Sequence, residues 1–370
     1  MVIRSEEMDP SFIEEIEKLG GESVRKCYQC ASCTATCPLT SDIKAFPRRT
    51  IRLVQLGLRE RAVRSPDIWL CSACATCKAS CPREANPGEV MAALRRYAYS
   101  RFSWLPSLSK HLTSSPKIVV PAMGLVGAIL VALMFSVGNV SNLASAVSFL
   151  AFLPSNLVDI AGMMLGVATA FGIGMNSLKL WKTVARPLGD PPEITIRQRF
   201  RNLLDVVVQE VALQRTIRKC NTGRLQWLAH LSLIAGFAGA GVTTTLVFLF
   251  NAGMPFQLDS PVKILGNLSA GLLLFGSAAL IGKRIFQKPT IGETLFQDGL
   301  FISMLFVVAL TGTLAEVFRL VNTSMLAYPT YSIHLVSVLL LLGLAPYTKF
   351  AHAIYRPLAM YAAKLTGWPN

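Results

Sequence analysis

CYQCASCTATCP at residues 27–38 and CSACATCKASCP at residues 71–82 share one pattern, Cys-x2-Cys-x2-Cys-x3-Cys followed by proline. Eight of the nine cysteines in the 370-residue chain belong to these two runs. Four thiolates at this spacing suit a [4Fe-4S] cluster, and in two-cluster ferredoxins the fourth cysteine of each run binds the other cluster. The sequence therefore predicts two clusters whose ligands cross between the runs.

This crossing assigns a ligand set to each cluster. The first is expected on Cys27, Cys30, Cys33 and Cys81, and the second on Cys71, Cys74, Cys77 and Cys37. Zinc is a weaker alternative, because zinc sites pair cysteines across a longer spacer and often add histidine, which this segment lacks. A disulfide framework also fits poorly, since the acidic first twenty residues have no apolar signal segment. We therefore expect the clusters on the cytoplasmic side.

The composition points to a membrane protein. Apolar residues make up 52% of the chain and charged residues 15%, against about 25% charged in ordinary soluble proteins. The formal net charge is +15, but the basic residues stand at the ends of apolar runs and are not interleaved with aromatic residues. Nucleic acid is therefore not an expected partner, and the pattern is that of positively charged cytoplasmic loops.

Helical spacing of apolar residues between the two cysteine runs predicts a helix within residues 46–57, ended by Gly57. Residues 83–116 resemble a polar connector whose basic residues, Arg95 and Arg96 among them, are expected at the anionic membrane surface. The predicted fold class is all-α. We expect a two-cluster ferredoxin domain over 1–100, a basic connector over 101–117 and a membrane cytochrome b domain over 118–370.

Six apolar runs in the second part are each near the ~20 residues that cross a bilayer. They lie at about 118–137, 156–177, 226–250, 263–283, 299–320 and 329–351. Basic residues gather in the loop at 178–225, in the loop between the fourth and fifth predicted spans, and in the tail. Both termini are therefore expected in the cytoplasm. Apolar residues at helical spacing between Phe200 and Ile217 predict an amphipathic helix within the first of these loops.

Ionisable residues inside a membrane are costly and are functional by default. His230 opens the third predicted span and His352 follows the sixth, so antiparallel spans would bring both rings to one depth. Two neutral imidazoles on facing helices suit the axial positions of a b-type haem. We expect one haem b on this pair.

His334 leaves more than one role open. It precedes His352 by eighteen residues, which in one continuous helix is five turns, so the rings would share a face about 27 Å apart. It could hold a second haem, although the outer half of the third span offers no histidine or methionine as partner. It could instead contact a quinone or relay its proton. The third alternative is a hydrogen-bonded interior histidine.

These residues resemble a known family. The twin motif with Phe46-Pro47-Arg48-Arg49 and Ile68-Trp69-Leu70-Cys71 is similar to the C subunit of heterodisulfide reductase. Gln226-Trp227-Leu228-Ala229-His230, with the spacing of His334 and His352, resembles the cytochrome b subunit of that enzyme and the gamma subunit of respiratory nitrate reductase. The two parts in one chain resemble the C subunits of quinone-interacting membrane-bound oxidoreductase (Qmo) complexes.

The resemblance implies an electron-transfer subunit of a quinone-dependent oxidoreductase. Menaquinol would be oxidised in the membrane, and electrons would pass through haem b and the two clusters to soluble flavin and iron-sulfur partners related to the A subunit of heterodisulfide reductase (HdrA-like). Those partners would supply adenylylsulfate reductase in sulfate reduction. In the nitrate reductase family each ligand helix supplies two histidines, whereas here the position ten residues after His230 is Ala240. Two alternatives stay open: a membrane anchor for a ferredoxin module, and the equivalent subunit of a heterodisulfide- or sulfite-reducing complex.

Overall fold

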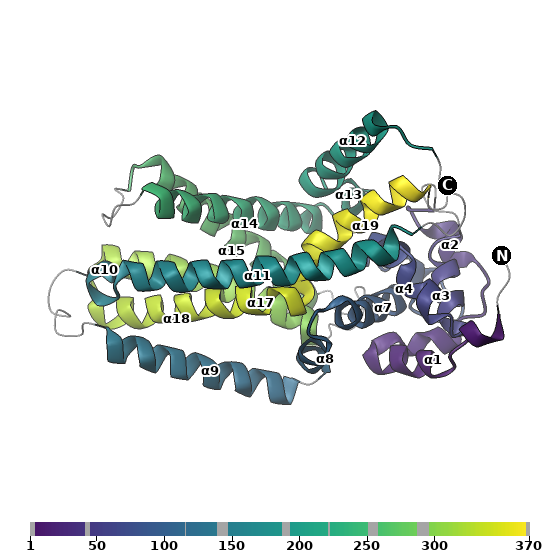
Figure 1. Ribbon diagram of the computed structural model, residues 1–370, viewed down its shortest axis with the longest axis horizontal. Helices are drawn as coiled ribbons and strands as arrows, with labels where there is room; N and C mark the ends of the chain where they lie inside the picture. The colour runs from purple at the N-terminus through teal and green to yellow at the C-terminus, as the bar shows by residue number, and fades with distance from the viewer. Residues whose placement is uncertain are drawn as a thin grey trace.

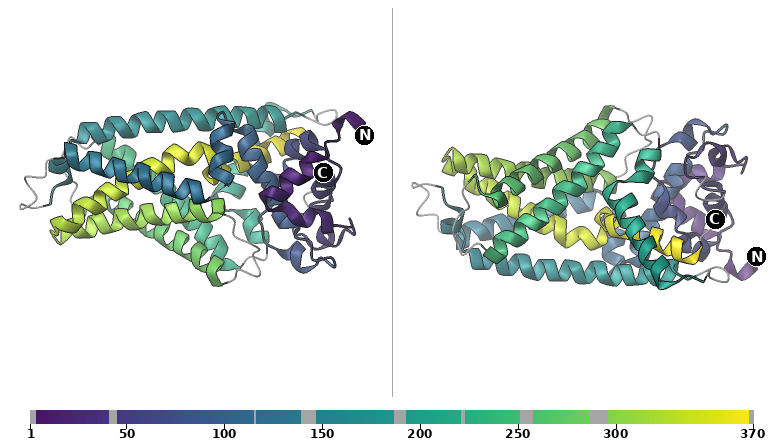
Figure 2. Two further views of the ribbon diagram at one scale, coloured as in Figure 1. Left: turned by 90° about the horizontal axis from the view of Figure 1, so that it is seen from below. Right: turned by 90° about the horizontal axis from the view of Figure 1, so that it is seen from above.

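The computed structural model describes residues 4–40, 45–114, 116–138, 147–186, 193–220, 223–250, 258–286 and 296–367. Within these ranges every regular element is a helix and no strand occurs, which confirms the all-α expectation. Figure 1 shows a bundle of long helices that continues at one end into a group of short helices. The two views of Figure 2 show the same division from above and below.

The short helices form the N-terminal part of the chain. They are α1 (Ser11–Ile16), α2 (Ser32–Thr36), α3 (Arg48–Gln55), α4 (Arg59–Arg64), α5 (Asp67–Leu70), α6 (Thr76–Ala79) and α7 (Pro87–Phe102). α7 is the central element, because α1, α3, α4, α5 and α6 all pack against it. Phe12, Ile51, Ile68 and Met91 are among the side chains that this packing buries completely.

Gly57 follows the end of α3, as the sequence predicts. Its φ is +66°, a left-handed conformation in which side chains are strained. The backbone of Asp9 also approaches so closely that a Cβ at position 57 would lie 2.5 Å from the Asp9 carbonyl oxygen. The N–H of Asp9 donates to the carbonyl of Gly57 at 2.9 Å, so this glycine joins α3 to the start of α1.

The first half of the expected connector at 83–116 is instead the buried helix α7. Asn86 caps it by accepting a hydrogen bond from the N–H of Glu89, and Pro87 occupies the first position, where its missing N–H costs nothing. Arg96 is only 7% exposed and donates to the carbonyl of Leu19 at 2.6 Å. The expectation of a leaflet-facing Arg96 is therefore wrong, because the helical register turns this side chain inward.

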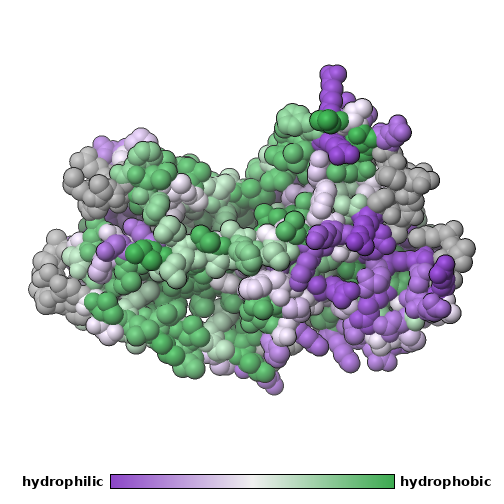
Figure 3. Space-filling model, viewed as in Figure 1, coloured by the Kyte–Doolittle hydropathy of each residue, from purple (hydrophilic) through white to green (hydrophobic). Residues whose placement is uncertain are grey.

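Six helices among the described residues are long and apolar enough to cross a membrane. They are α9 (Pro116–Val137), α11 (Ser155–Val184), α14 (Arg224–Phe250), α15 (Pro261–Phe286), α17 (Phe296–Leu320) and α18 (Ser324–Leu344). α15 packs between α14 and α17, and α18 packs on α17, α9 and α11. Figure 3 shows that hydrophobic residues cover the outside of this bundle, whereas hydrophilic residues gather over the short helices. The chain is a multi-pass membrane protein.

The sixth span does not continue to residue 351 as one helix. α18 ends at Leu344, and two 3-10 turns, Ala345–Tyr347 and Lys349–Ala351, separate it from α19 (His352–Thr366). Pro346 lies in the first turn and cannot donate a backbone hydrogen bond, which favours a break there. The prediction that His334 and His352 share one face of a continuous helix is therefore wrong.

α19 packs against the end of α11 and against α5 of the short helices. Its residue Tyr355 is 1% exposed and contacts Trp69 of α5 and Tyr99 of α7 at ring-centroid distances of 5.4 and 6.0 Å. Leu180 at the end of α11 belongs to the same buried core. One continuous hydrophobic core therefore joins the short helices to the end of the bundle.

The loop after α11 also contributes helices. α12 (Ile196–Asp205) runs through a π-helical turn, Val206–Ala212, toward α13 (Arg215–Lys219), where the sequence predicts an amphipathic helix. Val206 is buried in the shared core, whereas Phe200 is 61% exposed. Asp205 forms an ion pair with Lys364 of α19, which fastens this segment to the bundle end.

Candidate metal centres

The two cysteine runs fold as a repeated loop and helix. In each run a left-handed alanine, Ala31 with φ 71° or Ala75 with φ 61°, precedes the short helix that carries the third cysteine. This conformation curls the chain so that the cysteines before the helix and the cysteine inside it lie around one loop. α2 and α6 pack against each other, so the two loops are neighbours.

Polar groups surround the sulfur atoms in matching positions. The Ser32 hydroxyl lies 3.4 Å from Cys30 Sγ, and the Thr76 hydroxyl lies 3.4 Å from Cys74 Sγ. The backbone N–H of Ala73 donates to Cys71 Sγ at 3.4 Å. Hydrogen bonds to sulfur stabilise the thiolate form, which is the form that binds iron.

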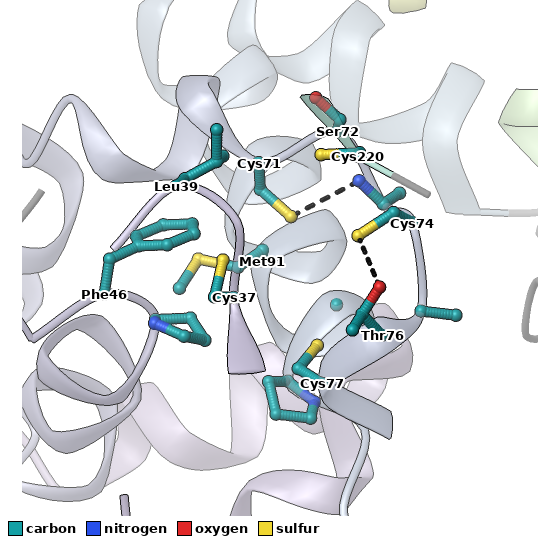
Figure 4. A pocket seen from close by; sticks show the side chains of 15 residues that line it. Cys37, Leu39, Phe46, Cys71, Ser72, Cys74, Thr76, Cys77, Met91 and Cys220 are labelled. Atoms are coloured by element: carbon teal, nitrogen blue, oxygen red, sulfur yellow. Dashed lines mark hydrogen bonds between the residues drawn. The ribbon is translucent and has the colours of Figure 1, made fainter. Parts of the chain in front are cut away.

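Cys37 lies with the second run rather than with its own. It lines a cavity with an empty volume of about 390 Å³, part of it open to solvent, and Figure 4 shows the thiols around it. The lining cysteines are Cys37, Cys71, Cys74, Cys77 and Cys220. The remaining wall is largely apolar, with Leu39, Phe46 and Met91. The structure therefore brings together all four thiols predicted for the second cluster.

Cys81 lies near the first run, close enough to Cys27 for its charge to act on that thiol. Cys27, Cys30 and Cys33 act on one another in the same way. In the described part of the chain, no three His, Cys, Asp or Glu side chains converge on a point that could hold a single metal ion. Thiols that surround a cavity suit a multi-atom cluster better than a single zinc ion. The crossed ligand sets stay a prediction.

The thiols differ in acidity. Burial raises the pKa of Cys37 to about 11, because the thiolate loses hydration. The Ser32 hydroxyl lowers the pKa of exposed Cys30, and the neighbouring thiol of Cys220 lowers the pKa of Cys74. Cys37 would therefore lose its proton on binding iron.

Two cations reach the second loop. Arg95 of α7 donates to the carbonyl of Cys71 at 2.7 Å, and Arg356 of α19 donates to the Ser72 hydroxyl at 3.3 Å. A cluster held by four thiolates carries net negative charge, which nearby guanidinium groups stabilise. Arg356 escaped the sequence analysis, since nothing in its local sequence indicates that α19 turns back to the cysteines.

His352 is the first residue of α19, and its ring is oriented by the chain itself. Nδ1 lies within hydrogen-bonding distance of the Lys349 carbonyl, so Nδ1–H is the donor and Nε2 keeps its lone pair for a ligand. Burial lowers the pKa of His352 to about 4, and the charge of Lys349 acts in the same direction. The imidazole is therefore neutral at physiological pH, as an axial haem ligand must be.

His230 lies in the second turn of α14 and faces the same region. It is close enough to His352 for their charges to interact. One face of α14 carries both His230 and Phe237, and Phe237 contacts Phe350 at 5.1 Å, two residues before His352. The structure thus brings the two predicted ligands together, and paired imidazoles with one orienting carbonyl fit a b-type haem in donor chemistry.

His334 lies elsewhere, against α17. Its Nδ1 is 3.0 Å from the Val308 carbonyl and 3.2 Å from the Thr311 hydroxyl. Gly312 makes room for the ring, because a Cβ there would lie 2.8 Å from His334 Cε1. These contacts are those expected of an interior hydrogen-bonded histidine, which is one of its three possible roles. The other two, contact with a quinone and ligation of a second haem, stay predictions.

A partly buried charge cluster adjoins His352. Asp298, at the start of α17, accepts hydrogen bonds from Lys349 and, at 3.4 Å, from Arg96 of α7. This cluster could not be predicted from the sequence, because Asp298, Lys349 and Arg96 are far apart in the chain. The cluster links α7, α17 and the turn before His352, so it fixes the bundle end relative to the short helices.

Comparisons with known proteins match one family model and two kinds of relative. The family described as 4Fe-4S dicluster domain matches residues 26–86. The chain is 33% identical over 97 residues to the C subunit of the H(2):CoB-CoM heterodisulfide,ferredoxin reductase of Methanothermobacter marburgensis, covering 26% of this chain and 52% of that protein. It is 35% identical over 79 residues to the iron-sulfur C subunit of the CoB--CoM heterodisulfide reductase of Methanopyrus kandleri, covering 19% and 41%.

A second kind of relative matches a longer stretch of the chain. The E subunit of the dihydromethanophenazine:CoB--CoM heterodisulfide reductase of Methanosarcina thermophila is 28% identical over 183 residues, covering 44% of this chain and 67% of that protein. The chain spans about half the length of the two C-type relatives named above, and no solved structure matches it. The chain therefore carries a 4Fe-4S dicluster domain and has relatives among both the C and the E subunits of heterodisulfide reductases, as a fusion of the two would.

Proposed function

We propose that this chain is a membrane electron-transfer subunit that oxidises menaquinol and delivers electrons to soluble proteins through haem b and two [4Fe-4S] clusters. His230 and His352 would hold the haem, and the eight cysteines of the two runs would hold the clusters in the crossed arrangement. These groups supply one-electron transfer, which the amino-acid side chains alone do not provide.

The main support for the proposal is the position of α19. This helix begins with His352, and one turn later Arg356 donates to Ser72, the neighbour of Cys71. Four helical residues rise about 6 Å, so one short rigid element spans the distance from the haem ligand to the second cluster loop. An anchor that only tethers a ferredoxin to the membrane needs no such element.

The surrounding residues insulate this route. Trp69, Tyr99 and Tyr355 pack edge to face between α5, α7 and α19, and all three are at most 5% exposed. Such packing excludes water and fixes the distance between the two centres. Asp298 with Lys349 and Arg96 holds the adjoining turn in place.

The orientation in the membrane follows from charge. Lys179 and Lys182 lie near the C-terminal end of α11, and Lys283 and Arg284 lie near the C-terminal end of α15. Basic residues favour the cytoplasmic side. We therefore place the dicluster domain and both termini in the cytoplasm, where soluble HdrA-like flavin and iron-sulfur subunits could dock and supply adenylylsulfate reductase in sulfate reduction.

A second candidate function comes from the relatives' names. The related E subunits belong to enzymes called dihydromethanophenazine:CoB--CoM heterodisulfide reductases, so the same fold could serve a complex that reduces a heterodisulfide. Co-purification from the native membrane distinguishes the two. HdrA-like flavoproteins without a heterodisulfide-reducing protein favour our proposal, whereas a co-purifying protein with that activity favours the alternative.

The proposal is tested by adding a menaquinol analogue to the purified full chain under anaerobic conditions and following the visible spectrum. We expect haem b bands to appear first and cluster absorbance to fall afterwards. His230→Ala and His352→Ala should each lose the haem bands, while His334→Ala, the matched intramembrane control, should keep them. A wild-type chain without haem bands, even after dithionite, contradicts the proposal.

A further inference from the structure

The ninth cysteine lies inside the wall of the second cluster cavity. Cys220 follows α13 in the loop between the second and third spans, yet it is only 4% exposed. It lines the cavity together with the four cysteines predicted to hold the second cluster, and Figure 4 shows it beside Ser72 and Cys74. The thiols of Cys220 and Cys74 line the same cavity, so the two sulfur atoms are neighbours there.

The segment that carries Cys220 is held on both sides. The Thr216 hydroxyl donates to Glu210 at 2.6 Å, which secures the start of α13. Further along, Trp227 donates its indole N–H to the Leu213 carbonyl at 3.0 Å, and Arg218 lies over the Trp227 ring at 5.6 Å. The position of Cys220 is therefore set by the membrane part of the chain.

The internal repeat shows what Cys220 adds. Cys30 and Cys74 occupy the same position in the two runs, and each has a hydroxyl 3.4 Å from its sulfur. Cys30 is exposed, whereas Cys74 is half-buried and has the thiol of Cys220 as a second neighbouring hydrogen-bond donor. The second cluster already has four predicted ligands, so the fifth thiol is left to act as a donor.

We propose that the Cys220 thiol donates a hydrogen bond to Cys74 Sγ and thereby raises the reduction potential of the second cluster. The inference rests on the clusters of the proposed function. A hydrogen bond to a ligating sulfur stabilises the more negatively charged, reduced cluster, and so raises its potential. The loop between the second and third spans thus tunes a centre bound by the N-terminal part of the chain.

The test is a redox titration of the purified full chain, monitored by EPR, for wild type, Cys220→Ala and Cys220→Ser. Cys27→Ser and Cys71→Ser, each in the first cysteine of its own run, serve to assign the two cluster signals. We expect Cys220→Ala to lower the midpoint potential of the second cluster, leave that of the first unchanged and keep the iron content. Cys220→Ser keeps a hydroxyl donor and should lie between Cys220→Ala and wild type.

Three results overturn the inference. If both potentials stay the same in Cys220→Ala, the thiol does not tune the cluster. If both shift equally, the effect is a general change of structure. If Cys220→Ala loses the second cluster's iron while Cys74→Ser keeps it, Cys220 is itself a ligand. A wild-type chain that shows neither cluster signal contradicts the proposed function, which separates that failure from failure of this inference.

Discussion

Trp69 is the residue whose removal should most directly separate the dicluster domain from the membrane bundle. It is 1% exposed and contacts Tyr355 of α19 at 5.4 Å with an interplanar angle of 88°, and Tyr99 of α7 at 5.6 Å. Trp69→Ala would leave a large cavity where the two parts meet. A buried aromatic residue changed to alanine costs about 3–5 kcal/mol of unfolding free energy, of which each aromatic pair contributes about 0.5–1.5 kcal/mol.

The loss can be measured as the urea concentration at which the clusters' visible absorbance disappears from the purified full chain. With a denaturant slope of about 3 kcal/mol per molar urea, the midpoint should fall by about 1 M or more. Trp69→Phe is the matched control. The indole N–H of Trp69 has no hydrogen-bond partner, so phenylalanine loses no hydrogen bond and keeps an aromatic ring, and its midpoint should fall by less than that of Trp69→Ala.

A double-mutant cycle identifies the contact responsible. Trp69→Ala and Tyr355→Ala should be less than additive by about 0.5–1.5 kcal/mol, since each removes the same pair. If Trp69→Ala unfolds at the wild-type urea concentration, the aromatic packing does not hold the two parts together, and our account of their junction is wrong.

Three further tests, which use four substitutions, address separate parts of the structure. Cys37→Ser should abolish the EPR signal of the second cluster and Cys81→Ser that of the first; loss of each run's own cluster instead would refute the crossed ligands. Asp67 is fully buried and accepts hydrogen bonds from Arg49 at 2.7 Å and from Thr50, so Asp67→Ala should lower stability to urea by about 1.5–3 kcal/mol, and an unchanged midpoint would count against it. Gly312→Val should displace the His334 ring and cost about 1–3 kcal/mol, yet leave the haem b spectrum intact, whereas loss of the haem bands would mean that His334 is a ligand.

Much of the fold could be predicted from local pattern. Six apolar runs gave six helices of spanning length, because lipid leaves few other ways to satisfy a backbone. The spacing of the cysteines indicated the dicluster domain, which the family match over residues 26–86 supports independently. Gly57 could be predicted as a helix end because glycine is common in the left-handed conformation that follows helices, and its φ is indeed +66°.

What escaped prediction depends on contacts distant in sequence. The break after Leu344 lies near the end of the apolar run predicted at 329–351, where Pro346 is the residue that favours it. The sequence of α7 contains several basic residues, which are normally exposed, so it suggested a surface connector. The burial of Arg96 depends on its contacts with distant residues and could not be predicted from the local sequence. The roles of Cys220 and Arg356 arise only when the loop after α11 and the C-terminal helix pack on the second cysteine loop.

The account as a whole depends on a haem held at the start of α19, next to a pair of cubane clusters. The most direct measurement is the content of haem, non-haem iron and acid-labile sulfide in one preparation of the purified full chain, with its dithionite-reduced spectrum. We predict one haem b and about eight non-haem iron atoms with matching sulfide per chain. A preparation without b-type bands, or with far less iron, would contradict the account.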